Sequence, residues 1–240
     1  ILTVSCSIFK VLTDEFNFDL NKIQYFAGHS LGEYSALVCS DSLTFKDSLY
    51  LLHERGKAMQ NAVPIGKGSM IAVLGLKTNE IKDLLGKIDF KDSVCEIAND
   101  SSEGQIIISG DCDSVNLFQK ELKSKKIKSI PLKVSAPFHC SLMKVASENM
   151  KNKINQTTFS APKIEIVNNV TAGIEKDPNE IKKLLIRQIY STVNWRESML
   201  NMSKNGVKNF IEIGPGKVLS GMVKRTISEA KTFSINSIAD

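Results

Sequence analysis

The stretch from Ile23 to Ser40 places the strongest constraint on how this chain can fold. Its apolar run IQYFAG is typical of a buried strand that ends at Gly28, and the LGEYSALVCS that follows has the spacing of a helix. Gly28 and Gly32 flank Ser30, so the turn between strand and helix can be sharp. A strand that turns directly into a helix predicts a fold in which helices join parallel strands.

Strand and helix patterns also alternate on both sides of this stretch. Residues 1–16 have nearly helical apolar spacing, and Thr44 with Asp47 fits the capping box of a further helix. Later in the chain, the patterns predict helices near 141–155, around 178–190 and from 215, and strands at 163–170 and 207–214. The alternation predicts a mostly parallel sheet.

The middle of the chain follows a different order. Successive patterns predict a strand at 66–76, a helix at 77–88, two strands within 94–110, a helix at 113–126 and a strand at 127–135. This βαββαβ order is typical of a ferredoxin-like unit. We therefore expect a core made of residues 1–62 and 138–240, interrupted by a ferredoxin-like insert at 63–137.

The composition of the chain indicates which kinds of molecule it is expected to bind. A chain of 240 residues that is 42% hydrophobic can bury a large core. Its 31 basic and 26 acidic side chains leave a net charge of +5, which favours an acidic protein partner over nucleic acid. No apolar run approaches the roughly 18 residues that a membrane span needs, so no membrane partner is expected.

The five cysteines are widely spaced and include no C-x-x-C pair. This pattern is typical of reduced thiols in a cytoplasmic protein and predicts neither a metal site nor a disulfide framework. The chain starts at ILTVSC without an initiator Met or a signal peptide. We expect that a segment is missing before Ile1.

Ser30 is the candidate nucleophile. It lies in the string G-H-S-L-G, and a serine on a strained turn between strand and helix is exposed to substrate. The first amide of the helix, that of Leu31, would donate to a developing oxyanion. The alternative is that Ser30 is only part of a tight turn.

A nucleophilic serine needs a base, and the chain has three histidines. His29 adjoins Ser30 and is expected to point away from it, and His53 lies inside a predicted helix. His139 follows Pro137 where the insert returns to the core, and clefts form at such junctions. His139 is therefore the candidate base, and a packed histidine at the junction is the alternative.

The order of these residues excludes one class of enzyme. In α/β-hydrolases an acid follows the serine and the histidine comes last, near the C-terminus. Here 101 residues follow His139 and none of them is a histidine. A Ser/His pair oriented by a carbonyl or an amide remains consistent with the sequence.

Arginine is rare in this chain, with 4 Arg among the 31 basic residues. Arginine is favoured where a planar, bidentate donor is needed. Arg55 lies on the helix after the serine helix, and it could bind a substrate carboxylate through two parallel hydrogen bonds. The alternative is an ordinary ion pair on a helix face.

Several strings together resemble the malonyl-CoA:acyl carrier protein transacylases of fatty acid synthesis. They occur in the order of that family and cover nearly the whole chain, as AGHSLGEYSAL (27–37), VSAPFHC (134–140), VNNV (167–170), RQIY (187–190) and IEIGPGKVLSGMVKR (211–225). The resemblance implies an α/β-hydrolase-like core with a ferredoxin-like insert.

The resemblance also implies a role for each matching position. Ser30 corresponds to the serine that is acylated, and His139 to the general base. Gln188 corresponds to the residue whose backbone carbonyl orients the histidine in place of an acid.

Three further positions correspond to substrate-binding residues. Arg55 matches the arginine that pairs with the free carboxylate of malonate, Leu31 the oxyanion amide, and Phe138 the malonyl-selective form of its motif. The implied substrate is malonyl-CoA, with no cofactor and no metal.

The implied reaction is ping-pong transfer of malonyl, through malonyl-Ser30, to the phosphopantetheine thiol of an acidic acyl carrier protein. The alternatives are a serine thioesterase or esterase, and a non-catalytic fragment that docks a carrier protein. Family members begin with a strand and a G-Q-G-S-Q loop that supplies a second oxyanion amide, and this sequence lacks that loop. We therefore expect a fragment that is unstable or weakly active in isolation.

Overall fold

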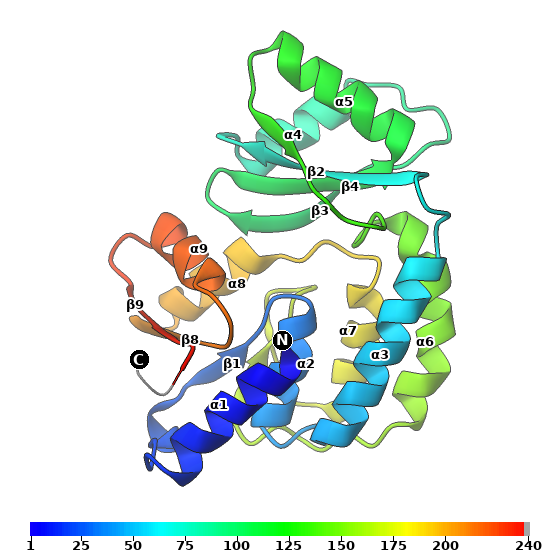
Figure 1. Ribbon diagram of the computed structural model, residues 1–240. Coiled ribbons are helices and arrows are strands. Elements are labelled where there is room, and N and C mark those ends of the chain that lie inside the picture. Colours follow the sequence, from blue (N-terminus) through cyan, green and yellow to red (C-terminus); the bar gives the residue numbers. More distant parts are fainter. Residues whose placement is uncertain (238–240) are drawn as a thin grey trace.

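The computed structural model describes residues 1–237, which form a larger lower part and a smaller upper part (Figure 1). The helices are α1 (Leu2–Asp14), α2 (Leu31–Cys39), α3 (Phe45–Asn61), α4 (Thr78–Leu85), α5 (Cys112–Ser124), α6 (Lys144–Gln156), α7 (Pro178–Gln188), α8 (Trp195–Lys204) and α9 (Val218–Thr226), with short 3-10 helices at Leu20–Lys22 and Ser141–Met143. The strands are β1 (Tyr25–Ala27), β2 (Gly68–Leu74), β3 (Cys95–Ser102), β4 (Gln105–Asp111), β5 (Ser129–Pro131), β6 (Glu165–Val167), β7 (Ile174–Glu175), β8 (Asn209–Ile213) and β9 (Lys231–Ile235).

Within the described residues, the parallel strands of the lower part form two separate sheets. β1 pairs in parallel with β6, and β7 lies antiparallel to β6. β8 and β9 form a second, parallel sheet. The sequence predicts β1, β6 and β8 but not this division, because apolar runs report burial and do not tell which strand edges are bonded.

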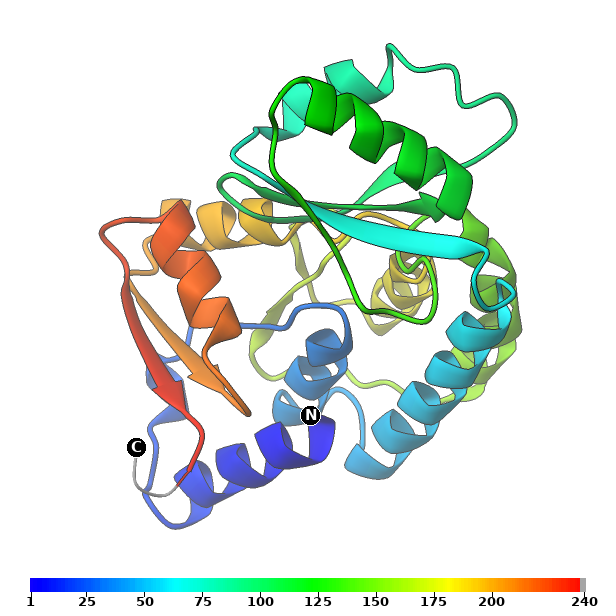
Figure 2. The ribbon, with the colours of Figure 1, turned by 45° about the horizontal axis from the view of Figure 1, so that its top comes forward.

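The upper part follows the predicted order, as β2-α4-β3-β4-α5-β5. Its strands form an antiparallel sheet in the order β3-β4-β2-β5. Helices α4 and α5 cover one face of this sheet, and the other face is turned toward the lower part (Figures 1 and 2).

Both faces of this sheet are buried. On β2, Ile71 and Val73 pack under the helices against Phe118, whereas Ala72 lies on the opposite face in a cluster with Phe138. A strand buried on both faces is apolar at every position, which explains the run MIAVL in β2. The sheet therefore rests directly on the segment that carries His139.

The chain passes between the lower and upper parts twice, near Gly68 and near Pro137, and these two segments are in contact. A Cβ added to Gly68, at the start of β2, would lie 2.3 Å from ring atoms of Pro137. Glycine is required at this position, because a side chain would separate the segment that enters the upper part from the segment that leaves it.

Helices pack around β1 and β6 in the lower part. The main core joins α2, α3, α6 and α7, and its fully buried side chains include Tyr34, Leu37, Leu51, Met150, Ile154 and Leu185. Because α3 packs against α6 and α6 against α7, this core keeps the helices of the candidate site in one arrangement.

The predicted start of α3 is confirmed, since the Thr44 hydroxyl accepts a hydrogen bond from the backbone N–H of Asp47. The patterns in the sequence did not predict α8 or β9. Trp195, Met199 and Met202 have helical spacing and are buried, so the periodicity of α8 was present but short. No helix within residues 1–237 is long and apolar enough to cross a membrane.

We expect Phe118→Ala to lower the free energy of unfolding by about 3–5 kcal/mol, because it removes a fully buried ring and leaves a cavity under α5. Leu117→Ala is the matched control, because the neighbouring Leu117 is 45% exposed on the same helix. Urea unfolding followed by circular dichroism measures both variants. Equal losses would contradict this description of the upper core.

Candidate active site

Ser30 lies at the turn between β1 and α2, with a backbone φ of 52° and ψ of −100°. A positive φ is unusual for a residue with a side chain, so the surroundings must hold it. Asn169 does so from the loop after β6. Its Oδ1 accepts a 2.6 Å hydrogen bond from the Ser30 N–H, and its Nδ2 donates to the carbonyl of Gly28 at 2.8 Å.

The turn also depends on close approach of the two flanking glycines. A Cβ on Gly28 would lie 2.0 Å from the carbonyl group of Gly32, in the first turn of α2. No side chain fits in that space. The strand can therefore turn into the helix within three residues and leave Ser30 at the bend.

His139 lies beside Ser30, although 109 residues separate them in the sequence. Its Nε2 is 2.8 Å from Ser30 Oγ, and its Nδ1 is 2.8 Å from the backbone carbonyl of Gln188. A carbonyl can only accept, so Nδ1 carries the hydrogen and Nε2 is free to take the serine proton. The predicted base is thus within reach of the predicted nucleophile, and a carbonyl lies where a triad acid would.

The ring of His139 is neutral. It is 5% exposed, and burial lowers its pKa to about 3, with a further contribution from the nearby Arg55 guanidinium. An imidazole with this pKa is unprotonated near neutrality, so its Nε2 lone pair is free to face the serine hydroxyl.

Arg55 projects from α3 into the same space. One of its terminal nitrogens donates to Ser30 Oγ and to Gln188 Oε1, both at 2.9 Å. The guanidinium also lies 5.9 Å from the centre of the Tyr34 ring, and burial lowers its pKa. Its Nε is buried and has no hydrogen-bond partner within the described part of the chain. A buried cation with donors next to the serine can bind an anionic group of a substrate.

The side chain of Gln188 joins Arg55 to a residue that the sequence analysis missed. Its Nε2 donates to Glu33 Oε2 at 2.8 Å and to the Ser30 carbonyl at 3.1 Å. Glu33 is 2% exposed and also accepts from the backbone N–H of Asn169 at 3.0 Å. One signal in the sequence could have identified it, because Glu33 is the one acidic residue of the otherwise apolar or small-residue helix LGEYSALVC.

Residues 22–239 match the acyl transferase domain family. The chain belongs to this family. It is 42% identical to the malonyl CoA-acyl carrier protein transacylase of Bacillus subtilis, over 88% of this chain and 67% of the relative. It is 38% identical to the protein of the same name from Haemophilus influenzae, over 100% of this chain and 76% of the relative.

Solved structures match nearly the whole length of this chain. An acyl carrier protein S-malonyltransferase from Vibrio cholerae superposes with a TM-score of 0.95 at 39% identity, covering 99% of this chain and 77% of that chain. A malonyl-transacylase in complex with its type II PKS acyl-carrier protein superposes with a TM-score of 0.94 at 36% identity, covering 99% and 76%.

Two other predicted residues of this acyltransferase lie at the edges of the site. Leu31 is the first residue of α2, where backbone N–H groups have no partner within the helix and point toward the serine end. Phe138 precedes His139 and packs between the main core and the lower face of the upper sheet. Each therefore adjoins a residue of the Ser30–His139 pair.

The other two histidines of the acyltransferase do not contact Ser30 Oγ. The ring of His29 packs edge-on against Trp195 at 5.7 Å, and burial lowers its pKa to about 4. His53 is exposed on α3. Within residues 1–237 no group of three or more His, Cys, Asp or Glu side chains is arranged to hold a metal ion.

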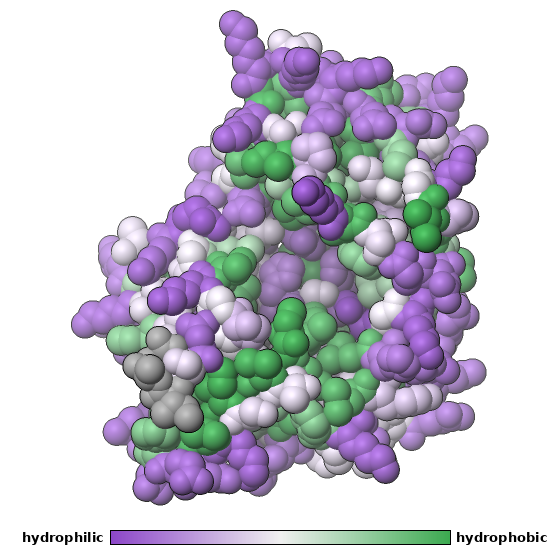
Figure 3. Space-filling model, viewed as in Figure 1, coloured by the Kyte–Doolittle hydropathy of each residue, from purple (hydrophilic) through white to green (hydrophobic). Residues whose placement is uncertain are grey.

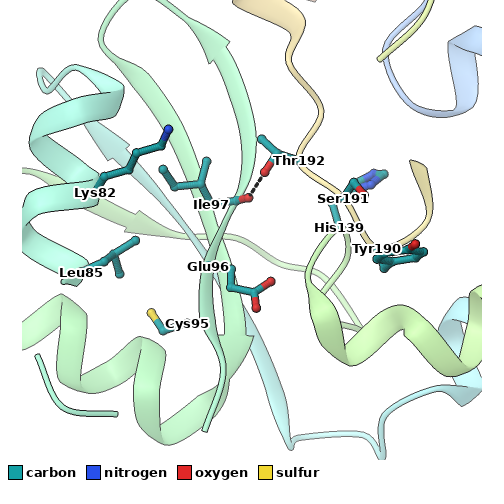
Figure 4. Close-up of a pocket in the computed structure, with 9 residues that line it drawn as sticks. All are labelled: Lys82, Leu85, Cys95, Glu96, Ile97, His139, Tyr190, Ser191 and Thr192. Carbon is teal, nitrogen blue, oxygen red and sulfur yellow. Dashed lines mark hydrogen bonds between the residues drawn. The ribbon is translucent and has the colours of Figure 1, made fainter. Parts of the chain in front are cut away.

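A cavity of about 480 Å³ reaches His139 from the junction of the two parts. It lies between β3, α4 and the segment after α7, and its lining residues are Lys82, Leu85, Cys95, Glu96, Ile97, His139, Tyr190, Ser191 and Thr192 (Figure 4). The surface is also hollowed below the upper part, with polar side chains inside the hollow (Figure 3). The acyltransferase site thus lies between its two parts.

We expect Gly28→Ala to lower the free energy of unfolding by about 1–3 kcal/mol, because the added methyl overlaps the backbone of α2. Gly32→Ala is the control. Nothing lies within 4 Å of a Cβ at Gly32, and alanine favours a helix, so stability should stay the same or rise. Urea unfolding compares them, and equal stability of the two variants would contradict the tight-turn description.

Proposed function

We propose that this acyltransferase moves the malonyl group from malonyl-CoA to the phosphopantetheine thiol of an acidic acyl carrier protein, through a malonyl ester of Ser30. The observation that carries the proposal is the Arg55 guanidinium, 2.9 Å from Ser30 Oγ and buried beside the Ser30–His139 pair. A cation at that position suits an acyl group that ends in a carboxylate. The names of the curated relatives, at 38–42% identity, support the same substrate.

In the first half of the reaction, Ser30 Oγ attacks the thioester carbonyl of malonyl-CoA while His139 Nε2 takes its proton. The carbonyl oxygen becomes an oxyanion near the N–H of Leu31, at the positive end of α2. When the C–S bond breaks, His139 returns the proton to the CoA sulfur, which leaves as a thiol. Malonyl-Ser30 and free CoA are the products.

The second half reverses these steps with a different thiol. The phosphopantetheine thiol of the carrier protein gives its proton to His139 and attacks malonyl-Ser30. The proton then passes to Ser30 Oγ as the ester bond breaks. Transfer to carrier protein requires that this thiol reacts faster than water.

Three residues position the reacting groups in both halves. Arg55 holds the malonyl carboxylate, and the backbone carbonyl of Gln188 holds the His139 ring. Phe138 fills the space beside the base and favours malonyl over bulkier acyl groups. The reaction needs no cofactor and no metal, because malonyl-CoA is consumed as a substrate.

We further infer that residues 1–62 and 138–240 form an α/β-hydrolase-like core and residues 63–137 a ferredoxin-like insert. The strand order β3-β4-β2-β5 with two helices on one face supports the second assignment, and the strand–turn–helix at Ser30 supports the first. The reduced cysteines and the substrates favour a cytoplasmic location.

The proposal is tested by acylation of Ser30. Incubation with malonyl-CoA should add one malonyl group to the wild-type protein, and Ser30→Ala should abolish the adduct because it removes the hydroxyl that faces the base His139. Intact-mass and peptide mass spectrometry locate the group. Ser35→Ala is the control, since its buried hydroxyl on the same helix has no partner within the described residues and should be dispensable.

The fate of the adduct separates a transferase from other functions. Holo acyl carrier protein should take up most of the malonyl group before water does. Release mainly to water would identify a thioesterase or esterase. Stoichiometric binding of carrier protein without any acyl-serine would identify a docking module.

Arg55→Ala should lower kcat/KM for malonyl-CoA by about 10- to 100-fold, since a hydrogen bond to a charged group contributes about 1.5–3 kcal/mol. Acetyl-CoA has no carboxylate, so its transfer should be spared or increased. Steady-state assays with both donors measure the ratio, with Arg187→Ala as a control because Arg187 is exposed on α7. An equal loss for both acyl groups would mean that Arg55 has only a structural role.

A further inference from the structure

Glu33 places a carboxyl group directly beneath the candidate site. It lies in the first turn of α2, three residues after Ser30, and is 2% exposed. Its Oε2 accepts two hydrogen bonds, from the Asn169 N–H at 3.0 Å and from Gln188 Nε2 at 2.8 Å. Both donors belong to the machinery that holds Ser30 and His139, so Glu33 is linked to each half of the pair.

The amide of Gln188 is held by opposite charges at its two ends. Its Nε2 points to the Glu33 carboxyl group and its Oε1 accepts from Arg55 at 2.9 Å. Turning this amide over would place an N–H against the guanidinium and an oxygen against the carboxyl group. Glu33 therefore fixes which end of Gln188 faces Arg55.

Arg55 also has no direct ion pair with any carboxylate within the described residues. A buried cation is costly unless a negative charge lies near it. Two ionisable groups favour the charged form of Arg55, Tyr34 and Glu33, both from α2. Tyr34 is neutral, because burial raises its pKa to about 12. Glu33 is thus the resident negative charge for this cation.

We propose that Glu33 is the positioning residue and resident counter-charge of the acyl site: its buried carboxylate orients Gln188 toward Arg55 and balances the guanidinium until the acyl carboxylate binds. This inference rests on the proposed malonyl transfer. When the acyl carboxylate binds, two negative charges, its own and that of Glu33, lie near the one buried cation of Arg55. Glu33 then takes up a proton.

The surroundings of Glu33 suit such a change of charge. Burial raises its pKa to about 7, even though Gln188, Asn169 and Arg55 all favour the charged form. Both hydrogen bonds end on Oε2, so a proton on Oε1 leaves them in place. His139 does not compete for the proton near neutrality, because its own pKa is lowered to about 3.

The test is the pH dependence of KM for malonyl-CoA. If malonyl binds to the form with neutral Glu33, the wild-type KM should rise about tenfold between about pH 6 and pH 8, since one unit of pH above the pKa is a tenfold change in the protonated fraction. In Glu33→Gln the side-chain oxygen can keep both hydrogen bonds while the charge is lost. Its KM should be lower than that of the wild type at about pH 8 and should vary less than about twofold over this range.

Two controls isolate the charge. Acetyl-CoA carries the same CoA phosphates without the second carboxylate, so its KM should not show the rise in either protein. Asp100→Asn removes a different buried carboxylate, one that pairs with Arg196, and should leave the ratio of malonyl to acetyl KM unchanged at each pH. A Glu33→Gln profile that follows the wild-type curve would overturn the proposal, as would the same rise with acetyl-CoA.

A second measurement uses the wild type alone and stands if Glu33→Gln fails to fold. Acylation at about pH 7.5 in weak buffer with an indicator dye should take up a proton with malonyl-CoA that it does not take up with acetyl-CoA. Equal proton uptake would overturn the role of Glu33 while malonyl-Ser30 still forms. Absence of malonyl-Ser30 would instead overturn the proposed function.

Discussion

Contact between Gly28 and Gly32 brings the end of β1 against the first turn of α2, and Ser30 lies at the bend between them with a φ of 52°. A serine in this conformation is strained and would relax if it were free to do so. Asn169 prevents this, because it bonds the backbone on both sides of the bend. The position of the Ser30 hydroxyl, and with it the geometry of the whole site, depends on this clamped turn.

The junction of the two parts decides what faces that hydroxyl. The upper sheet is buried on its lower face by the segment around Phe138, and the next residue is His139. Contact between Gly68 and Pro137 keeps the two chain crossings together, so His139 has little freedom to move. Its ring is then held between Ser30 Oγ and the carbonyl of Gln188. Packing between the parts thus supplies the orientation that a triad acid supplies in other serine enzymes.

Residues of the site differ in how far they could be predicted. Ser30 is marked by its flanking glycines, His139 by its place where the insert returns to the core, and Arg55 by the scarcity of arginine. Gln188 was assigned only by resemblance, because an orienting backbone carbonyl has no signal in the residue type. Glu33 and Asn169 were missed, since their function lies in contacts across 136 and 139 residues of chain, to Asn169 and Ser30 respectively.

The sequence by itself determined most of the strand and helix segments, though not α8 or β9, together with the sharp turn at Ser30 and the βαββαβ order of the upper part. These features follow from local spacing of apolar residues and from glycines, which act over a few residues. Only the tertiary structure decided that the parallel strands form two sheets, and that Glu33, Gln188 and Arg55 share one buried polar cluster. Such contacts join groups far apart in the chain, and their energies arise from burial in a low-dielectric interior that local patterns do not encode.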